Sequence, residues 1–191
     1  MFAFLKFMCY TYYIMKLGLI YMYCCFTGHR PQKLPWGNNE SDDRCTKFKK
    51  ILRNLIEESI HDGYYDFYCG MALGVDIYAA EIILDMQKKY KDVRLHAAIP
   101  CLGQEKGWRE SDKERYNKIL SQCNSKTIIS PFYSSSCMLT RNRFMVDNCD
   151  RLIAAWNGVL QGGTAFTIRY AKSQKKEIHL IRTEDLSITL L

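Results

Sequence analysis

The chain has 191 residues, of which 48% are hydrophobic and 25% are charged. That length and composition favour one compact domain and argue against a disordered chain, a repeat array or a two-domain enzyme. The formal net charge is +7, and residues 1–50 contribute +5 of it, with eight Lys and Arg residues against three Asp and Glu residues. Because the rest of the chain is nearly neutral, the charge argues against an extended nucleic-acid track and leaves room for a small anionic ligand.

The nine cysteines include no C-x-x-C pair. An odd count without the spacing of metal ligands is typical of reduced thiols in the cytoplasm, so we expect a cytoplasmic protein without a metal site. A catalytic cysteine is the alternative, but nothing in the sequence places His61, His96 or His179 beside one.

Residues 1–21 are apolar and rich in aromatic side chains. Lys6 and Lys16 lie inside this segment and no small-residue cleavage pattern follows, so it does not resemble a signal peptide. Its longest uncharged stretch is the nine residues 7–15, whereas a membrane-spanning helix needs about 20. We therefore expect no membrane partner, and we take residues 1–21 as an N-terminal extension of uncertain status before a domain at 22–191.

From residue 17 onward, short apolar runs alternate with stretches whose apolar residues recur at helical spacing. In chain order, they predict a strand at 17–26, a helix at 44–60, a strand at 67–69, a helix at 76–90, a strand at 93–99 that Pro100 stops, a helix at 110–123, a strand at 127–129, a helix at 138–146, a strand at 151–156, a helix at 165–173 and a closing strand at 178–181. This alternation indicates right-handed crossovers, so we predict a single α/β domain with a Rossmann-like, doubly wound and mostly parallel sheet.

Glycine-containing loops follow the first, second and fifth predicted strands, at 27–31, 70–76 and 157–164. In such a sheet, ligands bind outside the carboxyl ends of the strands. Glycine lets the backbone approach a ligand closely, and the amides at the start of the next helix face an anion. We therefore expect these three loops to meet in one pocket that holds negative charge.

Two of the loops offer distinct chemistry. Gly162-Gly163-Thr164 leads into a helix, where the Thr164 and Thr167 hydroxyls can bind phosphate oxygens, and an ordinary turn capped by threonine is an equal alternative. Asp76 follows the loop that Gly70 and Gly74 bracket. Helix capping is its simpler role, and hydrogen bonding to ligand hydroxyls such as those of ribose is the functional one. Neither loop matches a dinucleotide or P-loop fingerprint, so we expect no cofactor.

Arginine is the side chain best suited to clamp phosphate and to stack on a base. The candidates are Arg30, directly after the first strand, and Arg141 and Arg143, for which a solvated helix start is the alternative. His29 is a possible donor to a ligand or a residue that shapes the turn. The candidate stacking surfaces for a base are Trp36 and Trp108, although large aromatic residues more often cover a core.

Taken together, these motifs form a recognisable series. They are Cys24-Cys25-Phe26-Thr27-Gly28-His29-Arg30-Pro31, Gly70-Met71-Ala72-Leu73-Gly74-Val75-Asp76, Arg141-Asn142 with Met145-Val146-Asp147, and Gly162-Gly163-Thr164 with Thr167 and Tyr170-Ala171. The series resembles the YpsA-like branch of the SLOG superfamily over about residues 22–182. That superfamily includes the Lonely-guy phosphoribohydrolases and the DNA-processing protein A family. The resemblance implies a Rossmann-like fold that binds nucleotides or nucleotide-derived ligands at the glycine rim, and frequent dimers.

The resemblance is less direct for catalysis. Lonely-guy enzymes carry a P-G-G-x-G-T-x-x-E pattern whose glutamate assists cleavage between base and ribose phosphate. Matching Thr167 to the threonine places Tyr170 at the glutamate position, and Gln161 replaces the proline. Because the pKa of tyrosine is ~10, it cannot act as a carboxylate base at neutral pH. The candidate substitutes are Asp76, Glu81 and Glu105.

The leading hypothesis is a cytoplasmic protein that binds a nucleotide or an ADP-ribose-like derivative, as a sensor or regulator. The expected ligand-binding residues are Thr27, Gly28, His29, Arg30, Gly70, Met71, Ala72, Gly74, Asp76, Arg141, Asn142, Gly162, Gly163, Thr164 and Thr167. The alternatives are an N-glycosidic phosphoribohydrolase that acts on nucleoside monophosphates and a module that binds single-stranded DNA. Self-association into a homo-oligomer is also expected.

Overall fold

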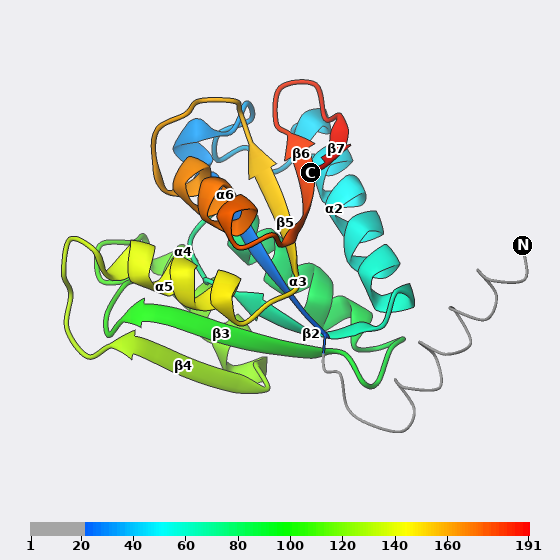
Figure 1. Ribbon diagram of the computed structural model, residues 1–191. Coiled ribbons are helices and arrows are strands. Elements are labelled where there is room, and N and C mark those ends of the chain that lie inside the picture. The colour runs from blue at the N-terminus through cyan, green and yellow to red at the C-terminus, as the bar shows by residue number, and fades with distance from the viewer. Residues whose placement is uncertain (1–21) are drawn as a thin grey trace, which may run out of the picture.

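The computed structural model describes residues 22–191 as a seven-stranded sheet with helices on both faces (Figure 1). The strands are β1 (Met22–Gly28), β2 (Tyr64–Cys69), β3 (Arg94–Cys101), β4 (Ser125–Ser130), β5 (Arg151–Trp156), β6 (Glu177–Arg182) and β7 (Ile188–Leu190). The helices are α2 (Asp43–His61), α3 (Val75–Met86), α4 (Glu110–Gln122), α5 (Cys137–Asp147) and α6 (Gly163–Ser173), with a short 3-10 helix, η1 (Pro31–Lys33). The predicted extension at 1–21 and the first residues of the predicted strand at 17–26 lie outside the described residues.

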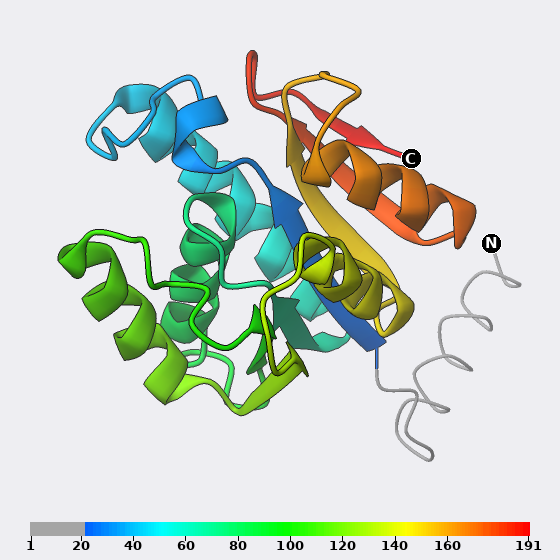
Figure 2. The same ribbon diagram turned by 90° about the vertical axis from the view of Figure 1, so that its left-hand side faces the viewer.

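The strand order is β4-β3-β2-β1-β5-β6-β7, and every neighbouring pair is parallel except β6 and β7. The predicted Rossmann-like, mostly parallel sheet is therefore confirmed. Helices α2, α3 and α4 lie on one side of the sheet, and α5 and α6 lie on the other (Figure 2). Each side has its own apolar core, with Phe26, Phe67 and Leu95 in the first and Cys25, Leu152 and Leu180 in the second. Both faces of the central strands are thus buried, which explains why their sequences read as continuous apolar runs.

The chain reverses direction across the sheet at β1. It proceeds outward from β1 to β4, and then α5 returns over β4, β3 and β1 to β5, which pairs with β1 on its other side. Such a switch point leaves a crevice at the carboxyl ends of the two central strands. The loops that follow β1, β2 and β5 all open toward this crevice.

Two elements differ from the predictions. Strand β3 does not stop before Pro100 but continues to Cys101. β2 pairs with β3 only as far as Ala97, and beyond that residue β3 has only β4 beside it. Pro100 has no partner in the register with β4, so its missing N–H removes no bond from the ladder. Strand β7 was not predicted. Its three residues are exposed, so the sequence carries no burial pattern there.

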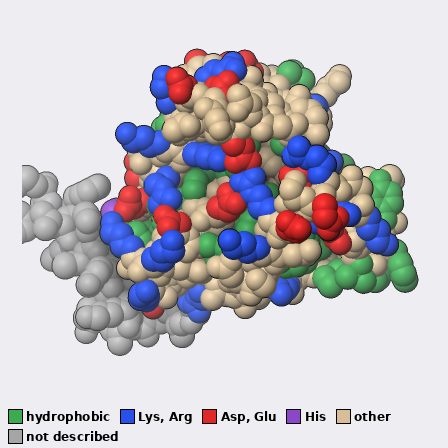
Figure 3. Space-filling model, turned by 180° about the vertical axis from the view of Figure 1, so that it is seen from behind, with side chains coloured by type: hydrophobic (Ala, Val, Ile, Leu, Met, Phe, Trp, Pro, Cys, Tyr) green, Lys and Arg blue, Asp and Glu red, His purple; other side chains and the backbone are tan. Residues whose placement is uncertain are grey.

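The surface opposite α5 and α6 carries charges of both signs. In Figure 3, Lys and Arg side chains alternate there with Asp and Glu side chains. Several are paired between neighbouring segments, as in the contacts Arg53–Asp85 (2.7 Å), Lys89–Glu57 (2.8 Å) and Arg115–Glu81 (2.6 Å). This face therefore lacks the continuous positive stripe that tracks a nucleic-acid backbone. Between Met22 and Leu191, no helix has the length and apolar character needed to cross a bilayer.

Candidate functional site

The three glycine-containing loops meet at the carboxyl ends of the central strands, as expected. They surround a cavity of about 380 Å³, which α5 closes from the other side. The predicted residues that line it are Thr27, Gly28, His29, Arg30, Ala72, Asp76, Arg141, Asn142, Gly163 and Thr164. Segments more than a hundred residues apart in the sequence therefore contribute to one wall.

Five predicted residues support this cavity from outside its lining: Gly70, Met71, Gly74, Gly162 and Thr167. Met71 is fully buried with φ of 58°, and its carbonyl accepts a hydrogen bond from Gln104. The Thr167 hydroxyl donates to the Gly163 carbonyl (2.7 Å) and accepts from the Asn142 amide (2.8 Å). Thr167 thus fixes the first turn of α6 and the position of Asn142, and its hydroxyl is not free for a phosphate oxygen.

The sequence prediction missed several lining residues, which are Phe26, Gln32, Lys33, Met138 and Leu139. Gln32 and Lys33 lie on η1, which is too short to show helical periodicity. Met138 precedes Arg141 by three residues on α5, so both project from one side of the helix. Helical spacing was therefore a usable signal for Met138.

Asp76 and Arg141 form a buried pair in the cavity wall. The exposed fractions of the two residues are 6% and 5%, and Asp76 Oδ2 lies 3.6 Å from Arg141 Nη1. Asp76 also accepts a hydrogen bond from the Ala72 amide (3.2 Å). Burial raises the pKa of Asp76 and lowers that of Arg141, and each charge partly offsets the burial of the other.

The Arg141 guanidinium has unused hydrogen-bonding capacity. Its Nε and Nη1 are buried without a hydrogen-bond partner among the described residues. Buried donors are nearly always bonded in folded proteins, so an unbonded pair marks a place for an acceptor. The guanidinium reaches this position only because residue 70 is glycine, since a Cβ there would lie 1.6 Å from Nη1.

His29 also lines the cavity, and it makes contacts with the loop after β5. Its Nε2 accepts a hydrogen bond from the Asn157 amide (3.2 Å), which assigns the ring proton to Nδ1, directed at the Thr164 hydroxyl (3.4 Å). Burial lowers the pKa of His29. The histidine thereby links the loop after β1 to the loop after β5.

This assignment predicts a stability change with pH. Because the folded-state pKa of His29 is lowered, its contribution is present above its ordinary pKa of about 6.5 and is lost as the pH falls below that value. We expect the difference in unfolding free energy between the unaltered chain and His29→Gln to shrink as the pH falls, since Gln keeps an acceptor but does not titrate. Urea denaturation at a series of pH values measures it, and a constant difference from about pH 5 to 8 would contradict the assignment.

Three other candidates lie away from the cavity. Trp36, proposed as a stacking surface, is 4% exposed and packs on Phe48 with ring centroids 5.1 Å apart, so the prediction that it stacks on a ligand is wrong. Arg143 lies over the Phe166 ring at 5.1 Å on the outer side of α5 and α6. Trp108 is only partly buried and lines a neighbouring cavity.

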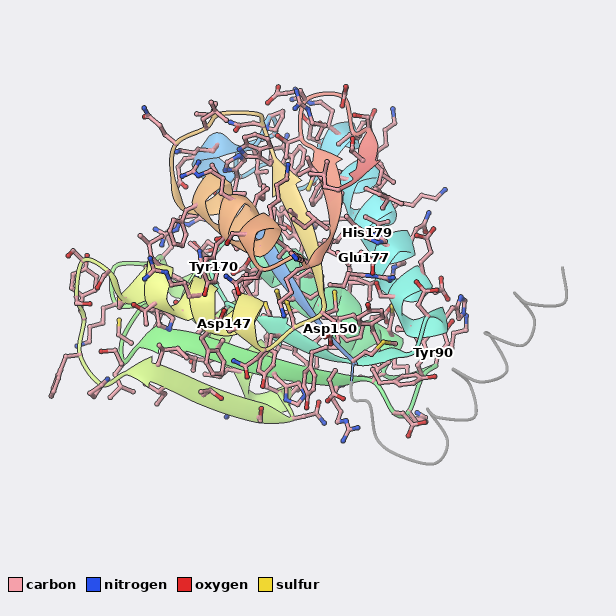
Figure 4. All side chains as sticks on the ribbon, viewed as in Figure 1. Tyr90, Asp147, Asp150, Tyr170, Glu177 and His179 are labelled. Atoms are coloured by element: carbon pink, nitrogen blue, oxygen red, sulfur yellow. The ribbon has the colours of Figure 1, made fainter. Side chains whose placement is uncertain are left out.

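Among residues 22–191, no glutamate lines the cavity in place of the one that a Lonely-guy pattern would supply. Tyr170 on α6 donates a hydrogen bond to Asp147 Oδ1 at the end of α5 (2.7 Å), and neither residue lines the cavity (Figure 4). Glu81 is bound by Arg115, and Glu105 is not in the lining either. Asp76 is the only carboxylate among the residues that line the cavity. The described part of the chain contains no group of three or more His, Cys, Asp and Glu side chains placed to hold a metal ion.

Comparison with known proteins agrees with this fold. The YpsA model, that of the YspA SLOG family, matches residues 24–186. The chain is 27% identical to the UPF0398 protein YpsA of Bacillus subtilis (strain 168) over 171 residues, which cover 86% of this chain and 94% of that protein. It is 30% identical over 151 residues to UPF0398 proteins of Bacillus thuringiensis (strain Al Hakam) and Bacillus cereus (strain AH187), covering 78% of this chain and 81% of each. The match begins within β1, ends after β6 and includes all three cavity loops, and the chain therefore belongs to the YspA SLOG family.

Proposed function

We propose that this protein binds a nucleotide or a nucleotide-derived ligand in the cavity at the carboxyl ends of β1, β2 and β5, with an uncharged oxygen of the ligand beside Arg141. The buried guanidinium with two unbonded nitrogens is the observation that carries the proposal. A ligand oxygen that accepts hydrogen bonds would satisfy these donors.

The phosphate position follows from the start of α6. Gly163 and Thr164 line the cavity at the N-terminus of this helix, where backbone amides and the helix dipole favour an anion. Lys33 and Arg30 also line the cavity, and neither side chain makes a hydrogen bond or a salt bridge with another residue between Met22 and Leu191. Two unpaired cations and a helix N-terminus therefore surround the same space, which suits a phosphate group.

The sugar position follows from Asp76. A carboxylate would repel a phosphate, but it accepts hydrogen bonds from hydroxyl groups. Asp76 lines the same cavity as Thr164 but comes from a different loop, so a phosphate at α6 leaves the sugar hydroxyls to face α3. A phosphorylated pentose is the smallest ligand that uses both ends of the cavity.

Isothermal titration with ribose 5-phosphate and AMP tests the proposal. We expect both to bind, and we expect Arg30→Ala to weaken binding by roughly tenfold, since a charge-assisted hydrogen bond contributes about 1.5–3 kcal/mol. Arg143→Ala is the matched control, because it removes the same charge from outside the cavity. If neither compound bound, or if the two variants lost affinity equally, the proposal would be rejected.

A second candidate function is N-glycosidic hydrolysis, and Asp76 is the observation that favours it. A buried carboxyl whose pKa is raised holds a proton more readily than an exposed one, as a general acid must. If the protein has this activity, we expect it to release free base from AMP, and we expect the Asp76→Asn variant to release none. Chromatography of the reaction mixture would detect the free base. We also propose a cytoplasmic location, which fractionation of cells would test, and a homo-oligomer, which size-exclusion chromatography with light scattering would test.

A further inference from the structure

A second cavity of about 390 Å³ adjoins the first. The residues of its lining that matter here are Arg30, Gln32, Asn38, Leu73, Gly107 and Trp108. Arg30 and Gln32 line both cavities, so their side chains form the boundary between them. Ala72 and Leu73 are adjacent in the chain and face the first and second cavity respectively. The two spaces are therefore neighbours on one rim of the sheet.

The second cavity has the features of a site for a planar ring. Trp108 lines it, and the edge-to-face contact of this indole with Tyr116 (centroids 5.4 Å apart, 82° between planes) holds the ring in place. Leu73 adds apolar surface beside it. The Asn38 side chain makes no hydrogen bond with any residue from 22 to 191, so its amide remains available to the edge of a base. Arg109 and Asp112 also line this space but bind each other (2.8 Å).

Arg30 lies between the two spaces with its charge unpaired. Because its side chain makes no salt bridge or hydrogen bond within the described residues, an anion that passed between the cavities would meet a free guanidinium. One phosphate at the start of α6 and a second at Arg30 would place the two ends of a diphosphate on either side of this boundary.

We infer that the two cavities together accept a nucleoside diphosphate joined to a sugar, with the sugar beside Asp76, the diphosphate between α6 and Arg30, and the base on Trp108. This inference rests on the proposed function, because the first cavity must bind a phosphorylated sugar. It adds a second binding region and a residue, Trp108, that holds the base and lies outside the glycine rim.

Titration calorimetry with ribose 5-phosphate, ADP-ribose and UDP-glucose tests the inference. Ribose 5-phosphate fits the first cavity alone, whereas the other two compounds carry both a sugar and a base on a diphosphate and can use both cavities. We expect the better of the two diphosphate compounds to bind at least tenfold more tightly than ribose 5-phosphate, since stacking of a base on an aromatic side chain contributes about 1–3 kcal/mol.

Two variants test whether the gain in affinity comes from the second cavity. Trp108→Ala removes the ring, and Gly107→Phe adds a bulky side chain in the lining of the second cavity, at a position where an added Cβ meets no atom within 4 Å. Both should abolish the roughly tenfold advantage and leave the affinity for ribose 5-phosphate unchanged. Tyr133→Ala is the control, since this aromatic side chain is 74% exposed and lines neither cavity. If Trp108→Ala failed to fold, Gly107→Phe would still decide the question.

The outcomes separate the two proposals. Ribose 5-phosphate binding with no advantage for either diphosphate compound would overturn the two-cavity inference and leave the proposed function in place. An advantage that persisted in both variants would overturn the inference in the same way. If none of the three compounds bound, the proposed function and the inference would both be wrong.

Discussion

Replacing Arg141 with methionine is expected to lower the free energy of unfolding by about 3–5 kcal/mol and to abolish binding of ribose 5-phosphate. The physical reason is that Asp76 would stay buried after the cation 3.6 Å from it is removed. A lone buried carboxylate loses its hydration without gaining a partner, so it must either remain charged at high cost or take up a proton. Urea denaturation followed by circular dichroism measures the first effect, and calorimetry measures the second.

A double variant distinguishes the structural role of Arg141 from its role in binding. Adding Asp76→Asn to Arg141→Met leaves no buried charge at the pair, so most of the lost stability should return. Binding should not return, because the guanidinium that faces the ligand is still missing. Tight binding of ribose 5-phosphate by the folded double variant would show that Arg141 does not contact the ligand.

Gly74→Ala is expected to produce the second largest change, a loss of about 3 kcal/mol of unfolding free energy that combines backbone strain with a clash. Gly74 has φ of 92°, a conformation that other residues rarely adopt, and an added Cβ would lie 2.5 Å from the His29 carbonyl oxygen. Since that oxygen belongs to the backbone, rotation of a side chain cannot relieve the contact. The loop after β1 would have to move away from α3, and the cavity between them would change shape.

Gly107→Ala is the matched control for this substitution. An added Cβ at residue 107 meets no atom within 4 Å, so the expected change is within about 0.5 kcal/mol. Thermal and urea unfolding of both variants provide the comparison. Equal stability of the two variants would mean that the contact between the two loops does not constrain the fold.

The sequence was sufficient to predict the central part of the sheet. β5 occurs at the predicted residues, and α2 and α4 agree with their predicted ranges within a residue or two at each end. These elements either have both faces buried or have one clear apolar stripe, so hydrophobic periodicity identifies them. Strand β7 has neither property, because it is short, exposed and held at the edge by β6 alone.

The part of the candidate site that the backbone of the glycine-containing loops forms could be predicted from the sequence. Glycines after strands indicated the three loops, and strand topology then brought them together. Identifying the residues that were missed requires the direction of each side chain, which the sequence does not show. Nothing in the sequence distinguishes Trp36, which packs in a core, from Trp108, which lines a cavity, since each lies next to a glycine and outside the predicted helices and strands. Whether the Arg141 guanidinium is bonded likewise depends on atoms of Gly70 and Asp76 that come together only in the folded chain.

The origin of the cavity walls has one consequence for folding. Gly28, Ala72 and Thr164 come from the beginning, the middle and the end of the described chain, and the cavity exists only when β1 has paired with both β2 and β5. No short contiguous segment supplies the whole lining. A molecule bound there would act as a non-covalent cross-link between the loops that follow β1, β2 and β5, so its binding energy would oppose unfolding of the entire domain and not of one loop.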